Sequence, residues 1–256
     1  MLAVGYGGHV RPPPLPHQVE VLRGVLERIA AASSAGGSVP IAVFDLDGTL
    51  YDTRPRTLQV LGEYADHVAV ERPDVAEALR SLELSHVHHL LRETLRECGL
   101  THADVIRDVT HFWQQRFYSD DYLAYDVPRP GAQEYVQACH DAGASIIYLA
   151  ERDVAGMLLG TVASLRDHGF PLAMPGVQLV LKPDATLGDE TFKRAVLPTL
   201  SRGGEVVGYF DDDVASCNLA RATFVRAAVG VVDAQTVPGA PEADPGIERV
   251  ADFRLV

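Results

Sequence analysis

The chain has 256 residues, 47% hydrophobic and 22% charged, which is the balance of a globular protein with a sizeable core. Its formal net charge of −13, from 22 basic and 35 acidic residues, argues against nucleic acid or an anionic membrane as a partner, because both bind basic surfaces. The sequence has neither a signal peptide pattern nor an apolar run of membrane-spanning length, so we expect a soluble, cytoplasmic protein.

Strands and helices are predicted to alternate along most of the chain. Residues 17–32 place apolar side chains at helical spacing, and the segment IAVFDLD (41–47) is typical of a short buried strand. Residues from about 55 to 118, rich in Leu, Glu, Arg and His, indicate several helices. Further strands separated by helices are expected at 144–150, 177–183, 205–213 and 226–232, and residues 233–256 are expected to be mostly loop.

This order of elements predicts an α/β fold with a Rossmann-like, mainly parallel sheet, whose site lies at the carboxyl ends of the strands. The helical block between the first two strands is an insertion that we expect to act as a cap over that edge. The expected organisation is an N-terminal extension with one helix (1–39), a core domain (40–52 and 128–256) and a helical cap domain (53–127).

Two predicted strands end in carboxylates, in the segments VFDLD (43–47) and YFDDD (209–213). If these strands are neighbours, Asp45, Asp47 and Asp211 converge on one point. Hard oxygen ligands without Cys or His suit magnesium, which takes few protein ligands and retains several waters. The DLDG segment alone is also compatible with a turn after a strand, and the second acidic strand end favours a site.

The segment DLDGTL (45–50) resembles the first motif of the haloacid dehalogenase-like superfamily of phosphatases. The resemblance implies that Asp45 attacks phosphorus to form an aspartyl-phosphate, and that Asp47 protonates the leaving group and later activates water. Alternate residues at a strand end suit these two roles. Gly48 would let the chain turn closely past the phosphate, and Thr49 would donate a hydrogen bond to it.

The segment FDDDVASCN (210–218) resembles the fourth motif of the same family, an acidic strand end that completes a metal site. The resemblance implies a Mg²⁺ site with Asp211 as a direct ligand and Asp212 in or near the coordination sphere. The metal-binding residues that we expect are Asp45, Asp47, Asp211 and Asp212.

The third motif of the family is a lysine that holds the nucleophile and the phosphate, and two residues are candidates. Lys193 lies near the start of the helix before the Asp211 strand, and Lys182 ends the third strand. We favour Lys193 and expect Lys182 to be a second phosphate contact. The alternative for each is an ordinary surface lysine.

The second motif departs from the family pattern. Close relatives read YLTGRD, whereas this chain reads YLAERD (148–153), so Ala150 replaces a hydroxyl residue and Glu151 replaces a glycine. The missing hydrogen bond to the phosphate is worth about 1.5–3 kcal/mol, and Arg152 is expected to compensate in part. A catalytically impaired protein that binds metal or phosphate is therefore the alternative, and the retained acids and lysine favour activity.

Taken together, the resemblance implies a magnesium-dependent phosphomonoester hydrolase acting on a small phosphorylated metabolite. A true dehalogenase is less favoured, since those relatives act without metal and lack an acid at the position of Asp47. Two segments of the expected cap carry no motif. The aromatic WQQRFY (113–118) lines the inner face of the cap or, as we favour, packs in its core, and SHVHHLL (85–91) is expected on a solvated helix face. The sequence carries no signature of oligomeric state.

Overall fold

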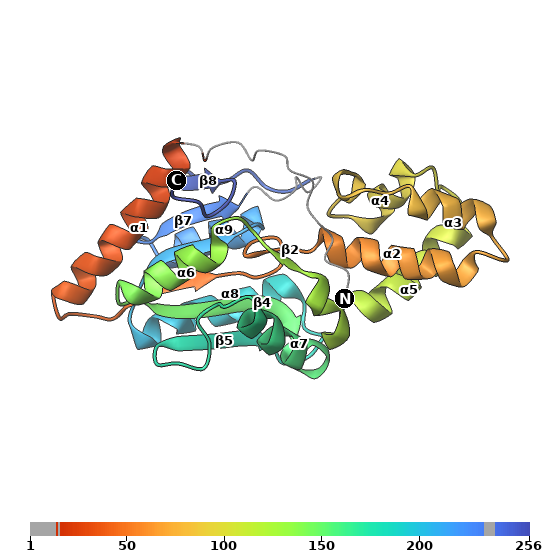
Figure 1. The fold of residues 1–256 in the computed structure, drawn as a ribbon. Helices are drawn as coiled ribbons and strands as arrows, with labels where there is room; N and C mark the ends of the chain where they lie inside the picture. The colour runs from red at the N-terminus through yellow and green to blue at the C-terminus, as the bar shows by residue number, and fades with distance from the viewer. Residues whose placement is uncertain (1–13, 15, 233–238) are drawn as a thin grey trace.

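The computed structural model describes Pro14, residues 16–232 and residues 239–256. Its centre is a parallel sheet of six strands in the order β5-β4-β1-β6-β7-β8, and the predicted Rossmann-like α/β fold is confirmed (Figure 1). The strands are β1 (Pro40–Phe44), β4 (Ser145–Asp153), β5 (Val177–Lys182), β6 (Glu205–Asp211), β7 (Ala228–Val232) and β8 (Ile247–Val250).

The sixth strand corrects the expectation of a loop over residues 233–256. Ile247–Val250 pairs in parallel with β7, so that Val229 lies opposite Ile247 and Val232 opposite Val250. Four residues in a Pro/Gly-rich acidic context carry too little periodicity to predict a strand, and the open edge of β7 supplies the missing partner. Residues 233–238 of the expected loop lie outside the described residues.

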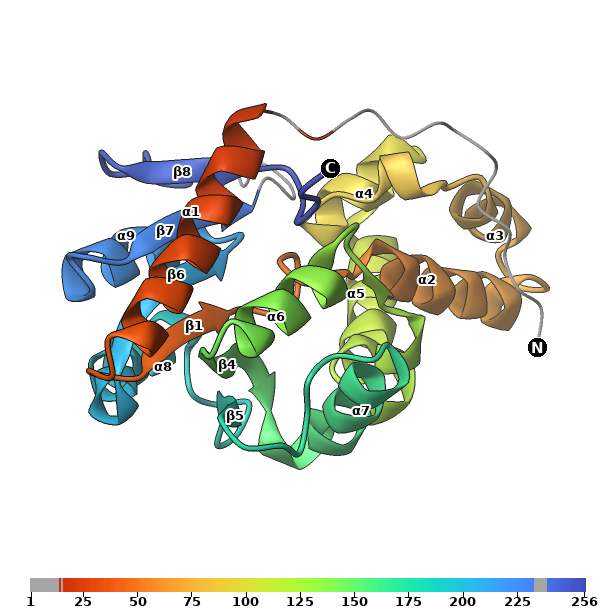
Figure 2. The ribbon, with the colours of Figure 1, turned by 60° about the vertical axis from the view of Figure 1, so that its left-hand side comes forward.

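Helices cover both faces of the sheet. On one face lie α1 (Pro16–Ser34), α6 (Ala132–Asp141) and α7 (Val154–Asp167), and on the other lie α8 (Asp189–Leu200) and α9 (Val214–Thr223). Figure 2 shows α1 and α6 together in front of the strands. The predicted amphipathic pattern of α1 is confirmed, because Leu22, Val25 and Ile29 are fully buried, each contributing about 1.5–3 kcal/mol.

Four further helices lie between β1 and β4 in sequence and stand to one side of the sheet (right in Figure 1). They are α2 (Arg54–Val68), α3 (Pro73–Arg80), α4 (Leu91–Glu97) and α5 (Ala103–Phe117). We call residues 54–126 the helical insertion. It has a hydrophobic cluster of its own, which includes Leu61, Tyr64, Leu95 and Val109.

The two chain connections to the helical insertion are tied to each other. Strand β2 (Tyr51–Asp52) and strand β3 (Val127–Pro128) pair in antiparallel fashion, with Tyr51 opposite Pro128. The backbone N–H of Arg129 also donates to the carbonyl of Leu50 at 2.8 Å. The insertion therefore leaves and rejoins the core at one place, directly beyond β1.

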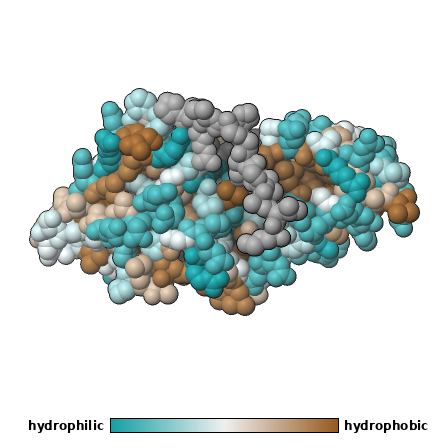
Figure 3. Space-filling view, in the orientation of Figure 1, coloured by the Kyte–Doolittle hydropathy of each residue, from teal (hydrophilic) through white to brown (hydrophobic). Residues whose placement is uncertain are grey.

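The histidine-rich segment differs from its expected form. Leu84–His86 is a single 3₁₀ turn and α4 starts only at Leu91, so His88 and His89 lie on irregular backbone and not on a helix face. On the face seen in Figure 3, hydrophilic residues predominate and hydrophobic areas are interspersed. Within the described part of the chain, no helix combines the length and the apolar character needed to span a membrane.

Candidate active site

The acidic ends of β1 and β6 lie side by side at the carboxyl edge of the sheet. The two strands are paired, Phe44 lies opposite Phe210, and the backbone N–H of Asp45 donates to the carbonyl of Phe210 at 2.9 Å. The prediction that these strands are neighbours is confirmed. As a result, Asp45, Asp211 and Asp212 each offer a carboxylate oxygen within 4.8 Å of the others.

Lys193 reaches this cluster from α8 and is 1% exposed. Its Nζ lies 2.6 Å from Asp211 Oδ2 and 3.8 Å from Asp45 Oδ1. Burial by itself would lower the pKa of Lys193, but Asp211 and the other nearby carboxylates hold it well above its usual value. Both candidate lysines line the neighbouring cleft, but only Lys193 lies beside Asp45, whereas Lys182 pairs with Asp189 at 2.6 Å.

The carboxyl group of Asp45 is buried, and its Oδ1 has no hydrogen-bond partner among the described residues. Burial raises its pKa well above the usual range, Lys193 opposes that shift, and Asp211 adds to it. Burial, with Asp211 next, also raises the pKa of Asp212 to about 8. Because buried carboxylates without donors are costly, the arrangement fits an added cation.

Gly48 provides the close turn past these carboxylates. Its φ is +83°, and a Cβ at this position would lie 2.1 Å from Asp212 Oδ2. Both facts require glycine. The next residue, Thr49, is fully buried, and its hydroxyl has no hydrogen-bond partner within the described residues.

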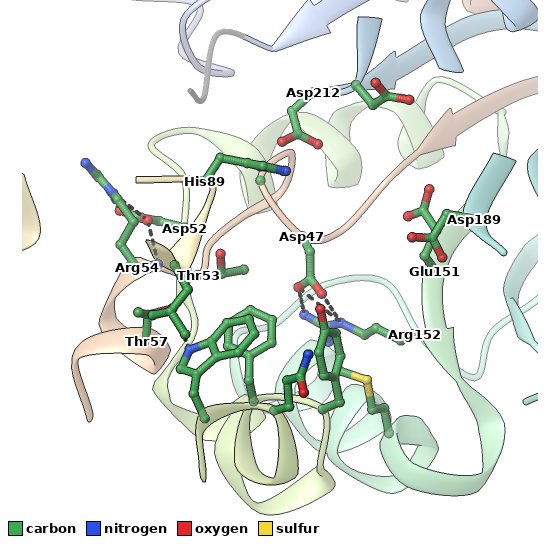
Figure 4. A pocket seen from close by; sticks show the side chains of 18 of the residues that line it. Asp47, Asp52, Thr53, Arg54, Thr57, His89, Glu151, Arg152, Asp189 and Asp212 are labelled. Carbon is green, nitrogen blue, oxygen red and sulfur yellow. Dashed lines mark hydrogen bonds and ion pairs between the residues drawn. The ribbon is translucent and has the colours of Figure 1, made fainter. Parts of the chain in front are cut away.

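Asp47 faces away from the cluster. Its Oδ1 accepts hydrogen bonds from Arg152 Nη2 at 2.5 Å and from Arg56 Nη2 at 2.8 Å, and Figure 4 shows Asp47 directed at Arg152. Burial acts to raise the pKa of Asp47, but the two guanidinium groups hold it well below its usual range. The side chain of Asp47 is therefore not brought together with the other three predicted metal ligands.

Both arginines also bind Asp126, at the end of the helical insertion. Arg56 donates to it at 2.8 and 2.9 Å and Arg152 at 2.8 Å. We call Asp47, Arg56, Asp126 and Arg152 the junction network, since it joins the core to both ends of the insertion. Sequence reasoning did not identify Arg56 or Asp126, because a charged residue gives no sequence signal of being buried against distant partners.

The altered second motif lies at the same edge, on β4. Ala150 is buried and is not part of the cleft lining, whereas Glu151 points inward, with its Oε1 2.5 Å from Lys193 Nζ. Burial raises the pKa of Glu151, and Lys193 opposes the shift. Arg152, which was expected to compensate for the missing hydroxyl, is instead held by Asp47, Asp126 and Thr161.

A cleft of about 610 Å³ lies between this edge and the helical insertion. The core contributes lysines and carboxylates to the lining of this cleft. The carboxylates include Asp47, Glu151, Asp189 and Asp212 (Figure 4). The insertion contributes Thr57, His88, His89 and several aromatic side chains. This volume suits a small molecule.

Several solved structures resemble this chain in fold, at low sequence identity. A predicted phosphoglycolate phosphatase from Haemophilus somnus 129PT is 15% identical, with a TM-score of 0.51, over 84% of this chain and 95% of the other. Protein Tyrosine Kinase A from Mycobacterium tuberculosis is 19% identical, with a TM-score of 0.50, over 84% of this chain and 94% of the other. The two names describe different activities, so the fold by itself does not assign one.

No curated protein matches the chain in sequence. A protein-family model described as haloacid dehalogenase-like hydrolase matches residues 39–173, which is more than half of the chain. The matched range contains Asp45, the junction network and the altered second motif. The chain belongs to the haloacid dehalogenase-like hydrolases.

Proposed function

We propose that this protein is a magnesium-dependent phosphomonoester hydrolase that acts on a small phosphorylated metabolite. The observation that carries the proposal is the convergence of Asp45, Lys193 and Asp211 at the carboxyl edge of the sheet. A buried carboxylate beside a charged lysine is a suitable nucleophile for phosphorus, since the ammonium group attracts the anionic substrate.

The acidic cluster fits magnesium. Asp45, Asp211 and Asp212 supply oxygen ligands within 4.8 Å of one another, and Asp45 Oδ1 lacks a donor among the described residues. Magnesium held there would reduce the repulsion between the Asp45 carboxylate and the phosphoryl group. The bond-forming and proton-transfer steps are carried out by side chains of the protein.

In the proposed reaction, a carboxylate oxygen of Asp45 bonds to phosphorus while the bond from phosphorus to the ester oxygen breaks. Asp47 gives its proton to that oxygen, and the alcohol leaves. A water molecule then attacks phosphorus and gives its proton to Asp47, while the bond between Asp45 and phosphorus breaks and phosphate is released. Lys193 would hold the phosphoryl oxygens, with Lys182 as a second contact from the cleft wall.

The orientation of Asp47 connects this chemistry to the helical insertion, which we propose acts as a cap. Hydrogen bonds from Arg56 and Arg152 favour the carboxylate form, which suits the step that activates water. Protonation of a leaving oxygen requires Asp47 to turn from Arg152. Since Arg56 belongs to the insertion, movement of the insertion would change the partners of Asp47.

The test is phosphate release from p-nitrophenyl phosphate and a panel of metabolite phosphates, with magnesium and with EDTA. Turnover that depends on magnesium and is lost in Asp45→Asn supports the proposal. Asp121→Asn, on the exposed surface, is the control and is expected to retain activity. Turnover that persists in Asp45→Asn contradicts the aspartyl-phosphate mechanism.

A second function, a protein that binds metal or phosphate without efficient turnover, is favoured by one observation. The carboxylate of Glu151 lies 2.5 Å from the amine that would hold the phosphate. A wild type without turnover, together with activity in the double variant Ala150→Thr, Glu151→Gly, would support this second function. Inactivity of both on the whole panel would contradict the hydrolase proposal.

A further inference from the structure

Three aromatic side chains of the helical insertion form one side of the cleft. Trp113 and Phe117 lie one turn apart on α5, and Tyr118 follows directly. The ring centroids of Trp113 and Phe117 are 4.2 Å apart and nearly parallel, and the ring of Tyr118 stands edge-on to Phe117 at 5.1 Å. We call these three residues the aromatic wall.

The side chains of the aromatic wall do not pack in the hydrophobic cluster of the insertion. Phe112, on the same helix, packs against the insertion's hydrophobic cluster, but Trp113 and Phe117 are not members of that cluster. Both are only half-buried, and Tyr118 is 52% exposed. The expectation that the WQQRFY segment packs in the core is therefore wrong for these rings, which face the cleft.

Contacts through Arg56 connect the aromatic wall to Asp47 at the carboxyl edge of the sheet. The indole Nε1–H of Trp113 donates to Thr57 Oγ1 at 3.4 Å, and the guanidinium of Arg56 lies 4.1 Å from the centre of the Phe117 ring. Arg56 also binds Asp47. Desolvation raises the pKa of Tyr118, and the negative charge of Asp47 raises it further.

Figure 4 shows ring side chains rising from the pale green helix of the insertion on the side of Asp47 where Thr57 lies. Three aliphatic side chains also line the cleft, namely Val87, Leu91 and Met157. A ligand whose phosphoryl group meets Asp45 would place the rest of its structure against this surface. Aromatic rings favour a flat, polarisable partner in stacked or edge-on contact.

The charges of the cleft limit which charged groups the ligand can carry beyond its phosphoryl group. Carboxyl side chains in the lining outnumber arginines and lysines by eight to five. Four of the five cations are already paired with carboxylates at 2.5–2.6 Å: Arg54 with Asp52, Arg152 with Asp47, Lys182 with Asp189 and Lys193 with Asp211. The fifth, Arg129, donates its Nε–H to the carbonyl of Gly48 at 2.7 Å. A second anionic group would therefore have to compete with these carboxylates for a cation.

We propose that the aromatic wall is the subsite for the leaving group, and that the substrate is a phosphomonoester of a planar aromatic alcohol or phenol that is uncharged or cationic beyond its phosphate. This inference rests on the proposed function, because it assumes that the phosphoryl group binds at Asp45. The volume of the cleft, about 610 Å³, accommodates one or two rings.

Trp113 is the only tryptophan of the chain, so its fluorescence reports directly on this subsite without any need for turnover. The experiment titrates Asp45→Asn in magnesium with phenyl phosphate, 4-(aminomethyl)phenyl phosphate, cyclohexyl phosphate and 4-carboxyphenyl phosphate. The first two are expected to change the emission and to bind about fivefold to tenfold more tightly than the last two.

A matched pair of variants locates the effect. Tyr118→Leu is expected to weaken the binding of phenyl phosphate about fivefold. Tyr125 is exposed and lies outside the cleft lining, so Tyr125→Leu is expected to leave the affinity unchanged. Equal affinity for phenyl and cyclohexyl phosphate, tighter binding of the carboxylated ester, or equal effects of the two variants would overturn the inference. Phosphate release from non-aromatic esters alone would overturn it while leaving the proposed function intact.

Discussion

Arg56 and Asp126 form a double hydrogen-bonded ion pair, with distances of 2.8 and 2.9 Å, in which neither side chain has any solvent exposure. Arg56 lies in α2, the first helix of the insertion, and Asp126 is the last residue of the insertion. Because Arg152 of the core binds the same carboxylate, Asp126 connects both ends of the insertion to the sheet.

Removal of the Asp126 charge is therefore expected to destabilise the protein strongly. Asp126→Asn leaves two buried guanidinium groups with only Asp47 as an anionic partner, and breaking a buried ion pair in this way costs about 3–5 kcal/mol. Urea unfolding followed by circular dichroism measures the loss. The control is Asp104→Asn, because its ion pair with Arg72 lies on the surface and exposed pairs contribute little. Equal effects of the two variants would contradict the buried network.

Glu151 is expected to limit the affinity for phosphate. In Glu151→Gln the side chain keeps its size but no longer places a negative charge 2.5 Å from Lys193 Nζ. We expect the inhibition constant of inorganic phosphate to fall about tenfold, which corresponds to about 1.4 kcal/mol. This inhibition constant is measured from the competition of inorganic phosphate with p-nitrophenyl phosphate as substrate. The control is Asp189→Asn, which removes a largely exposed carboxylate from the same cleft. This variant is expected to change the inhibition constant much less. An unchanged constant in Glu151→Gln would show that phosphate binds elsewhere.

The acidic cluster predicts that the metal-free protein loses stability as the pH rises. The pKa of Asp212 is raised from 3.8 to about 8 in the folded state, so the folded protein binds more protons than the unfolded chain between these values. The stabilisation from this group is complete below pH 4 and is lost as the pH rises toward 8. Thermal unfolding in EDTA between pH 5 and 8 is expected to show a falling midpoint.

Asp212→Asn is expected to flatten that pH dependence, because the amide does not titrate. Asp121→Asn, an exposed carboxyl group, is the matched control and should retain the wild-type slope. A slope that is the same in all three proteins would mean that the fall arises from general charge repulsion at a net charge of −13 and not from the acidic cluster.

Gly48→Ala is expected to damage the site and the fold together. A left-handed backbone costs a non-glycine residue about 1–2 kcal/mol, and the added methyl group would displace the Asp212 carboxylate. Urea unfolding and phosphate release measure the two effects. Gly62→Ala is the control, because Gly62 lies within α2 with no atom near the added methyl, and there alanine stabilises by about 0.5–1 kcal/mol. A Gly48→Ala variant as stable as the wild type would contradict the close approach to Asp212.

The acidic edge of the sheet was predictable from the sequence because its parts follow from local rules. Buried strands that end in Asp45 and Asp211 put both carboxylates at one edge once the strands are parallel neighbours, and the pairing of β1 with β6 confirms that relationship. The lysine was narrowed to two candidates, and only the packing of α8 shows that Lys193 is the one beside Asp45.

What the sequence by itself determined is the α/β fold, the family motif at Asp45 and the acidic character of the site. The tertiary structure decided the partner of each charge: Arg56, Asp126 and Arg152 around Asp47, and Glu151 on Lys193. It also decided that β8 completes the sheet and that the aromatic wall faces the cleft. The physical reason is that backbone periodicity and strand ends are local properties, whereas ion pairs, edge pairing and the direction of a half-buried ring depend on segments that meet only when the chain has folded.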